Sequence, residues 1–269
     1  MTDLHRNLVR YRYAINHLLA LESRQLEELT PEEVRLEEQW QHDLQPVLAD
    51  LYWYPLRNGI DEAPEGESEL RRWLTQRLGE AAAVAALLAL LNRYMVRSFN
   101  IGGALALQLM GLAGGFNLTD PAIRSELAAH AEGLVTVGTR LSLIDTTIDD
   151  LVVGIPQARE SEDNTIILLA ALIGGWALLR SVRIAATEQA RGTGWGMQRT
   201  YGRNGVAQMT FMTRADDRVC GLCGPNHGVV VPVNRVPADM QIPLHPSCRC
   251  YWLAVTAGWT PPETTWRGE

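Results

Sequence analysis

The sequence predicts an α+β fold, with a mostly α-helical body followed by a small C-terminal β module that a Cys/His cluster holds together. Apolar residues recur at helical spacing through the first two-thirds of the chain. After Gly205, short runs of β-branched and aromatic residues separated by Gly, Pro and Asn replace that pattern, and all four cysteines lie between positions 220 and 250. We therefore expect an N-terminal helical region (1–67), a helical body (68–205), a Cys/His β module (206–258) and an extended tail (259–269).

Start and stop signals place the helices. Leu4, Leu8, Tyr11 and Ile15 indicate a first helix. The sequence Thr-Pro-Glu-Glu at 30–33 is a capping box with proline at the first helical position, which predicts a second helix. This helix is expected to end near residue 49 and a loop to follow over 54–67. Further helices are predicted over 69–99, 121–137, 141–153 and 164–201, with a polar connection over 154–163, and strands over 206–213, 229–233 and 251–255.

Five glycines between positions 102 and 115 weaken the helical signal. Each costs about 1 kcal/mol relative to alanine in a helix. This stretch is therefore expected either to kink or to pack closely against another backbone.

The apolar segments are expected to be buried helices rather than membrane spans. The longest uninterrupted apolar run covers residues 166–179, whereas a span needs about 17–25 residues. The N-terminus is polar and charged and lacks the apolar core of a secretory signal. We expect a soluble protein without a membrane span.

Charge is distributed unevenly. The net charge of −7 argues against a general nucleic-acid coat, and every one of the 24 basic residues is an arginine. Either a GC-rich coding sequence or a preference for guanidinium groups would explain this bias. Seven arginines and three acidic residues lie between 180 and 218. This strip could contact DNA or an acidic partner, or it could be a solvated helix face with local ion pairs. The candidate contact residues are Arg180, Arg183, Arg191, Arg199 and Arg203.

The cysteines form two half-sites with the spacing of one tetrahedral zinc site. They are Cys220-Gly-Leu-Cys223 and His245-Pro-Ser-Cys248-Arg-Cys250. Five candidate ligands for four positions leave open a Cys₄ site, or a Cys₃His site with one free thiol. Such a closed site would be structural and would contribute folding energy. The alternatives are two disulfides or thiols that only pack, but without a secretion signal the thiols start reduced, which favours a metal.

Charged and histidine side chains near the cysteines are further candidates. Asp216 is expected to cap a turn and to pair with Arg218, although a carboxylate could also bind a metal. His227 could be a ligand, a general base or an exposed turn residue. Glu188 lies one helical turn before Arg191 and is expected to anchor its helix to the β module.

Several motifs together resemble the Mu F-like phage head morphogenesis proteins, also called minor head or minor capsid proteins. The resemblance covers about residues 90–255 and is sharpest over 183–250. The matching segments are Arg-Ile-Ala-Ala-Thr-Glu-Gln-Ala-Arg at 183–191, Gly202, Thr-Arg-Ala-Asp-Asp-Arg-Val-Cys-Gly-Leu-Cys at 213–223, Gly228, and Pro-Leu-His-Pro-Ser-Cys-Arg-Cys at 243–250. The chain departs mildly from the family at Phe211-Met212 and at Ile242-Pro243.

The resemblance implies a noncatalytic structural protein of a tailed phage or prophage. It would be present in few copies per virion, at the portal vertex or in the capsid interior, after assembly in the host cytoplasm. Its expected partner is the portal protein, with the major capsid or scaffolding protein and packaged double-stranded DNA as further candidates. It would serve head assembly, DNA packaging and DNA ejection.

Two rival functions follow from the same residues. The histidines at 227 and 245 near the Cys-x-x-Cys pair are compatible with a zinc-supported nuclease or toxin-like enzyme acting on DNA, although no catalytic constellation is recognisable in the sequence. A plain DNA-binding zinc module is the other alternative.

Overall fold

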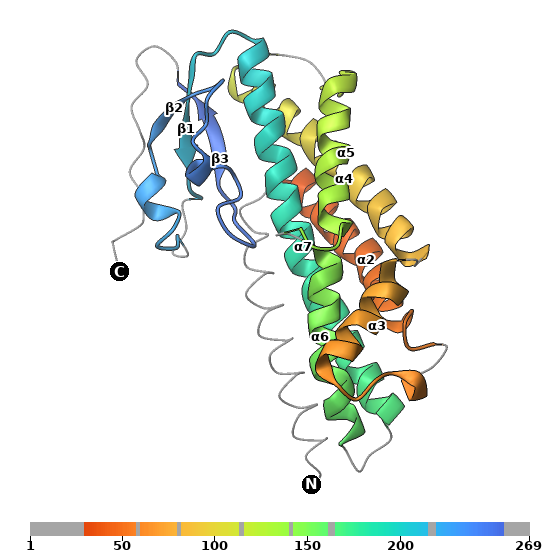
Figure 1. Cartoon of the computed structure of the whole chain (residues 1–269). Coiled ribbons are helices and arrows are strands. Elements are labelled where there is room, and N and C mark those ends of the chain that lie inside the picture. Colours follow the sequence, from red (N-terminus) through yellow and green to blue (C-terminus); the bar gives the residue numbers. More distant parts are fainter. Residues whose placement is uncertain are drawn as a thin grey trace. The chain divides into compact units, whose positions relative to one another are not determined.

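The computed structural model describes residues 30–57, 60–79, 82–112, 116–139, 142–160, 165–214 and 219–255. Within them the fold is α+β, as predicted, with helices first and a small antiparallel sheet near the C-terminus (Figure 1). The helices are α2 (Pro31–Trp53), η1 (Ile60–Glu62), α3 (Glu67–Gly79), α4 (Ala82–Leu109), α5 (Pro121–Val135), α6 (Leu143–Arg159), α7 (Thr165–Arg203), η2 (Gly224–Asn226) and η3 (Ala238–Met240). The strands are β1 (Gln208–Met212), β2 (Val230–Pro232) and β3 (Tyr251–Ala254).

The described residues form two compact units. The first takes residues 38–92 and 126–182, and the second takes 30–37, 93–125 and 183–255, with the gaps given above. The boundaries fall inside α2, α4, α5 and α7. The predicted division into four sequence segments stays a prediction, and both the predicted first helix and the 259–269 tail lie outside the described residues.

The predicted capping box opens α2. Thr30 N–H donates to Glu33 Oε2 at 2.8 Å, and Glu33 N–H donates to Thr30 Oγ1 at 3.2 Å. These two bonds satisfy backbone donors that the first helical turn would otherwise leave unpaired. Pro31 occupies the first helical position, as predicted, and the helix extends to Trp53 rather than ending near residue 49.

In the first unit, α6 continues through the segment predicted to be a polar connection. It ends at Arg159, beyond Gly154 and Pro156, and Ile155 and Ala158 are fully buried. A Cβ atom at Gly154 would lie 2.4 Å from the Trp176 ring, so the glycine allows close packing against α7. Burial of this apolar face outweighs the weak local helix propensity of the glycine and proline.

In the second unit, glycines let α4 and α7 cross at short range. A Cβ atom at Gly102 would lie 2.0 Å from Thr193 O, and one at Gly196 would lie 2.1 Å from Phe99 O. Both distances are far below van der Waals contact. Close approach of two backbones, one of the two predicted alternatives, therefore explains the glycine at 102.

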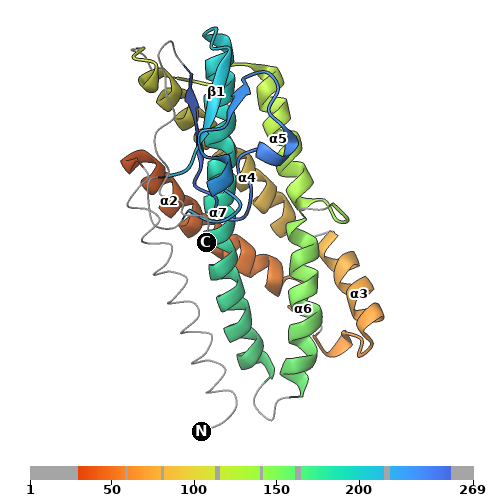
Figure 2. The ribbon, with the colours of Figure 1, turned by 90° about the vertical axis from the view of Figure 1, so that its left-hand side faces the viewer.

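The sheet packs against the C-terminal half of α7 within the second unit (Figure 2). Its strand order is β2-β1-β3, with both pairings antiparallel. Tyr201 OH donates to Trp252 O at 3.2 Å, and the Trp252 ring meets Phe211 edge-on at 5.5 Å between ring centroids. Gln198 Nε2 donates to Val233 O at 2.7 Å. The two hydrogen bonds join the helix to β3 and to the end of β2, and the ring contact joins β3 to β1.

Two helices, α4 and α7, are long and apolar enough by length and composition to cross a membrane. In the apolar 18-residue segment of each helix, 39% is buried. The expected burial of these helices therefore holds for only part of their surface. Core helices of soluble proteins pass the same test. The expected absence of a membrane span stays a prediction.

Replacing Gly196 with alanine should destabilise the second unit. The added methyl group would collide with Phe99 O and should lower the free energy of unfolding by about 1–3 kcal/mol. Gly174, also in α7, has nothing within 4 Å of its Cβ position. Gly174→Ala is therefore the matched control and should raise stability by up to about 1 kcal/mol. Urea denaturation of both variants checks this, and equal effects would contradict the close crossing.

Candidate metal centre

Two loops of the β module carry the candidate ligands. Cys220 and Cys223 lie on a tight turn between β1 and β2, in which the Cys220 carbonyl accepts the N–H groups of Cys223 at 3.1 Å and Gly224 at 2.9 Å. His245, Cys248 and Cys250 lie between η3 and β3. Cys248 N–H closes a turn onto His245 O at 3.2 Å. Each loop thus presents its donors from a hydrogen-bonded turn.

The fold brings all five predicted ligands together. His245 Nε2 lies 3.2 Å from both Cys220 Sγ and Cys223 Sγ, and Cys223 Sγ lies 3.9 Å from Cys248 Sγ. Two groups, Cys220–Cys223–His245 and Cys223–Cys248–Cys250, each keep their donor atoms within 4.8 Å of one another. A tetrahedral ion with metal–sulfur bonds of about 2.3 Å holds its sulfurs about 3.8 Å apart. These groups could therefore hold a metal ion, with Cys223 common to both.

The histidine ring has the orientation of a metal ligand. His245 Nδ1 lies 2.7 Å from Pro246 O. Because a carbonyl oxygen only accepts, Nδ1 carries the proton, and Nε2 keeps a lone pair directed at the two sulfurs. A backbone carbonyl on the second ring nitrogen is the usual means of fixing the tautomer of a metal-binding histidine.

Hydrogen bonds among the thiols set their charge. Cys223, Cys248 and Cys250 are buried, and Cys220 is half-buried. Hydrogen bonds from Cys223 and then Cys250 lower the pKa of Cys248. The bond to Cys248 is the main cause that raises the pKa of Cys223, and bonds with Cys223 and Cys248 raise that of Cys250. The three thiols therefore share protons through their hydrogen bonds, and a bound cation would replace those protons.

Helix α7 positions the second ligand loop. Ser247, between Pro246 and Cys248, has a left-handed backbone conformation with φ of 59°. Its N–H donates to Thr187 Oγ1 at 2.9 Å, and Thr187 Oγ1 donates to Arg183 O at 2.6 Å. The threonine hydroxyl therefore fixes an unusual turn between two candidate ligands.

The start of α2 supports the same loop through a buried ion pair. Arg214 Nη2 lies 3.3 Å from Glu33 Oε1, its Nε donates to Arg249 O at 3.2 Å, and its guanidinium lies over the Tyr251 ring. Arg249 lies between Cys248 and Cys250. The glutamate that caps α2 therefore holds, through Arg214, the segment that carries two cysteines.

Glu188 is buried and pairs with Arg191 Nε at 3.0 Å, as its i, i+3 spacing predicts. Its neighbour Thr187 makes the hydrogen bond to the β module described above. The sequence therefore indicates the right part of the helix, but it does not indicate Thr187, Glu33 or Arg214 as supports of the site. The sequence signal for Thr187 was its position next to Glu188 in the same motif.

The candidate contact arginines lie in both units. In the first unit, the Arg180 guanidinium donates to Tyr52 OH, Thr147 Oγ1 and Leu143 O and lies 3.8 Å from Asp150. Burial raises the pKa values of Tyr52 and Asp150. This arginine therefore serves a mostly buried polar network.

In the second unit, Arg191 pairs with Glu188 and Arg203 with Asp120, whereas Arg183 and Arg199 are exposed. Local ion pairs of this kind are what the sequence offered as the alternative to a DNA-binding or partner-binding strip between residues 180 and 218. Contact with DNA or portal stays a prediction. Asp216 and Arg218 lie outside the described residues.

His227 has a partner within the β module. Its Nδ1 lies 2.6 Å from Thr213 Oγ1 and accepts the Thr213 N–H at 3.2 Å. Since Nδ1 accepts a backbone N–H, the ring proton is on Nε2 in this arrangement. The histidine ties the end of β1 to the turn after η2.

Comparisons of the chain with protein families, with curated proteins and with solved structures found no match.

Glu33→Gln should weaken the second unit. It removes the carboxylate charge from the pair with the mostly buried Arg214, which should lower the free energy of unfolding by up to about 3 kcal/mol. The matched control is Glu32→Gln, since Glu32 is the exposed neighbour in the same first turn and its loss should cost about 0.5 kcal/mol. Urea denaturation measures both, and equal losses would show that the Arg214 pair is not important for stability.

Proposed function

We propose that this chain is a noncatalytic minor head protein of a tailed phage or prophage, acting at the portal or in the head interior during head assembly and DNA packaging or delivery. One observation supports it above others. Motifs that are dispersed over residues 183–250 and that resemble the Mu F-like family meet within one compact unit. Residues of the first motif contact the last, since Thr187 binds the Ser247 backbone.

We further propose that zinc is the resident metal and that its role is structural. Thiolate and imidazole ligands in a tetrahedral arrangement are the donors that zinc favours. Cys223 and Cys248 are 4% and 1% exposed, which suits a closed site rather than one with an open coordination position. The three strands have five, three and four residues, so the sheet is too small to be stable without packing or a cross-link.

In this proposal the zinc site serves to present a rigid surface. The ion would join the turn after β1 to the loop before β3, and α7 would support both from one side. The exposed Arg183 lies on α7 one turn before Thr187 and is the arginine we expect to contact the portal or DNA. No step of this role requires a reaction at the metal.

The purified chain should contain about one zinc ion per molecule, which elemental analysis measures.

His245→Ala should reduce zinc retention and hydrogen-exchange protection of β1 and β3, because the imidazole lies against two ligand sulfurs. His42→Ala, at a histidine whose side chain is 88% exposed, is the control and should change neither. Protection of α3 and α6 should persist in both variants. Full protection of the β module in metal-free protein would refute a structural zinc.

Particles of the phage or prophage that encodes the chain should contain it in a few copies each. Quantitative mass spectrometry of purified virions and DNA-free heads measures this number. Deletion of the gene should lower the yield of infectious particles while leaving capsid protein synthesis unchanged. Absence from particles, together with DNA cleavage by the purified chain in Mg²⁺ or Zn²⁺, would favour the nuclease function instead.

A further inference from the structure

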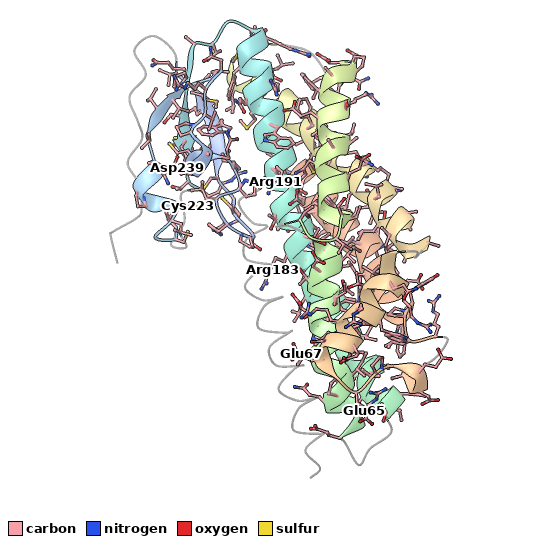
Figure 3. All side chains as sticks on the ribbon, viewed as in Figure 1. Glu65, Glu67, Arg183, Arg191, Cys223 and Asp239 are labelled. Atoms are coloured by element: carbon pink, nitrogen blue, oxygen red, sulfur yellow. The ribbon has the colours of Figure 1, made fainter. Side chains whose placement is uncertain are left out.

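A pocket of about 420 Å³ lies in the second unit beside the Cys/His cluster. Both metal-binding loops contribute to its wall, since Leu222 lies between Cys220 and Cys223, and Leu244 directly precedes His245. Arg191 of α7 and Asp239 of η3 also line it, and both are labelled in Figure 3 together with Cys223. The volume is within the range of small-ligand sites.

The polar lining is rich in hydrogen-bond acceptors. Asn226 uses its amide N–H₂ to donate to Leu222 O at 3.0 Å, and Gln241 uses its own to donate to Val236 O at 3.2 Å. Each amide therefore keeps its carbonyl oxygen for another donor. Asp239 adds an exposed carboxylate, which has no ion-pair partner among the described residues.

The one cationic group of the lining is already neutralised. Arg191 Nε lies 3.0 Å from Glu188 Oε2, and the two side chains are 17% and 6% exposed. With this pair balanced, Asp239 leaves the pocket with a net negative charge. Two amide oxygens and one carboxylate therefore favour a cationic ligand that carries several donors.

The apolar part of the lining selects the shape of that ligand. Leu222 is 62% exposed at the tip of the Cys-x-x-Cys turn and offers an apolar surface to a ligand in the pocket. Leu222 and Leu244 could cover the methylene stem of a long basic side chain while its charged end reaches the acceptors. A phosphate or nucleic-acid backbone offers neither an apolar stem nor a positive charge.

We propose that this pocket binds an arginine side chain presented by a protein partner. The guanidinium has five N–H donors in a planar fork, which matches a carboxylate in bidentate geometry and leaves donors for the Asn226 and Gln241 oxygens. Lysine offers a single point charge and would bind more weakly. This inference depends on the lining of the pocket and not on the proposed role in phage heads.

Ligand-observed NMR titration of the full chain tests the proposal. The probe is the peptide Gly-Ser-Gly-Xaa-Gly-Ser-Gly, in which Xaa is arginine, lysine or citrulline, the uncharged analogue of arginine. The arginine peptide should bind about tenfold more tightly than the citrulline peptide. Equal binding of arginine and citrulline, or no saturable binding of the arginine peptide, would overturn the proposal.

Variants of the pocket locate the binding. Asp239→Asn should weaken arginine-peptide binding about tenfold, and Asp239→Arg should abolish it. The control is Asp61→Asn in η1 of the first unit, another exposed aspartate, which should leave binding unchanged. If Asp239→Asn bound the arginine peptide as tightly as the unmodified chain, the pocket would not be the site.

The same titration separates this proposal from the zinc proposal. If zinc is resident, its removal should weaken arginine-peptide binding, because both metal loops line the pocket. If the purified chain contains no metal yet binds arginine over citrulline through Asp239, the zinc proposal fails and the pocket proposal stands. If a zinc-loaded chain binds the arginine and citrulline peptides equally well, the pocket proposal fails and the zinc proposal stands.

Discussion

The convergence of soft donors on Cys223 is the constraint on which the rest of the β module depends. Its sulfur lies close to His245 Nε2 and to Cys248 Sγ, so it connects the turn after β1 with the loop before β3. The three strands have only five, three and four residues and pack against α7, so the long loops between them depend on contacts of their own. The contacts within the cluster therefore join the two loops whose residues line the pocket.

Supports from distant parts of the chain hold the cluster in place within the second unit. Thr187 on α7 fixes the left-handed turn at Ser247, and Glu33 at the start of α2 holds Arg214 against the Arg249 carbonyl. The glycine at 196 lets α7 approach the α4 backbone about two and a half turns after Thr187. These contacts explain why a module with so small a sheet is built onto helices rather than connected to them by a linker.

Local chemistry made much of this predictable. The capping box at Thr30 depends on residues three positions apart, and a Cys-x-x-Cys turn depends on four consecutive residues. Both were therefore visible in the sequence. The connection expected after residue 154 was wrong, because burial of Ile155 against neighbouring elements outweighs local propensity. Arg180 was assigned to a contact strip, yet it binds Tyr52 and Thr147 in the first unit. Partners so distant along the chain leave no short-range pattern.

The sequence by itself determined the fold class, the helix start at Pro31, the strands of the module and the five candidate ligands, because each depends on residue type and on spacing within a few positions. Only the tertiary structure decided that Cys223 lies at the centre of the cluster, that Thr187 and Glu33 support it, and that an acceptor-rich pocket adjoins it. These features join residues that lie from 22 to 181 positions apart along the chain. Such pairs are selected by packing in three dimensions, which spacing along the chain does not encode.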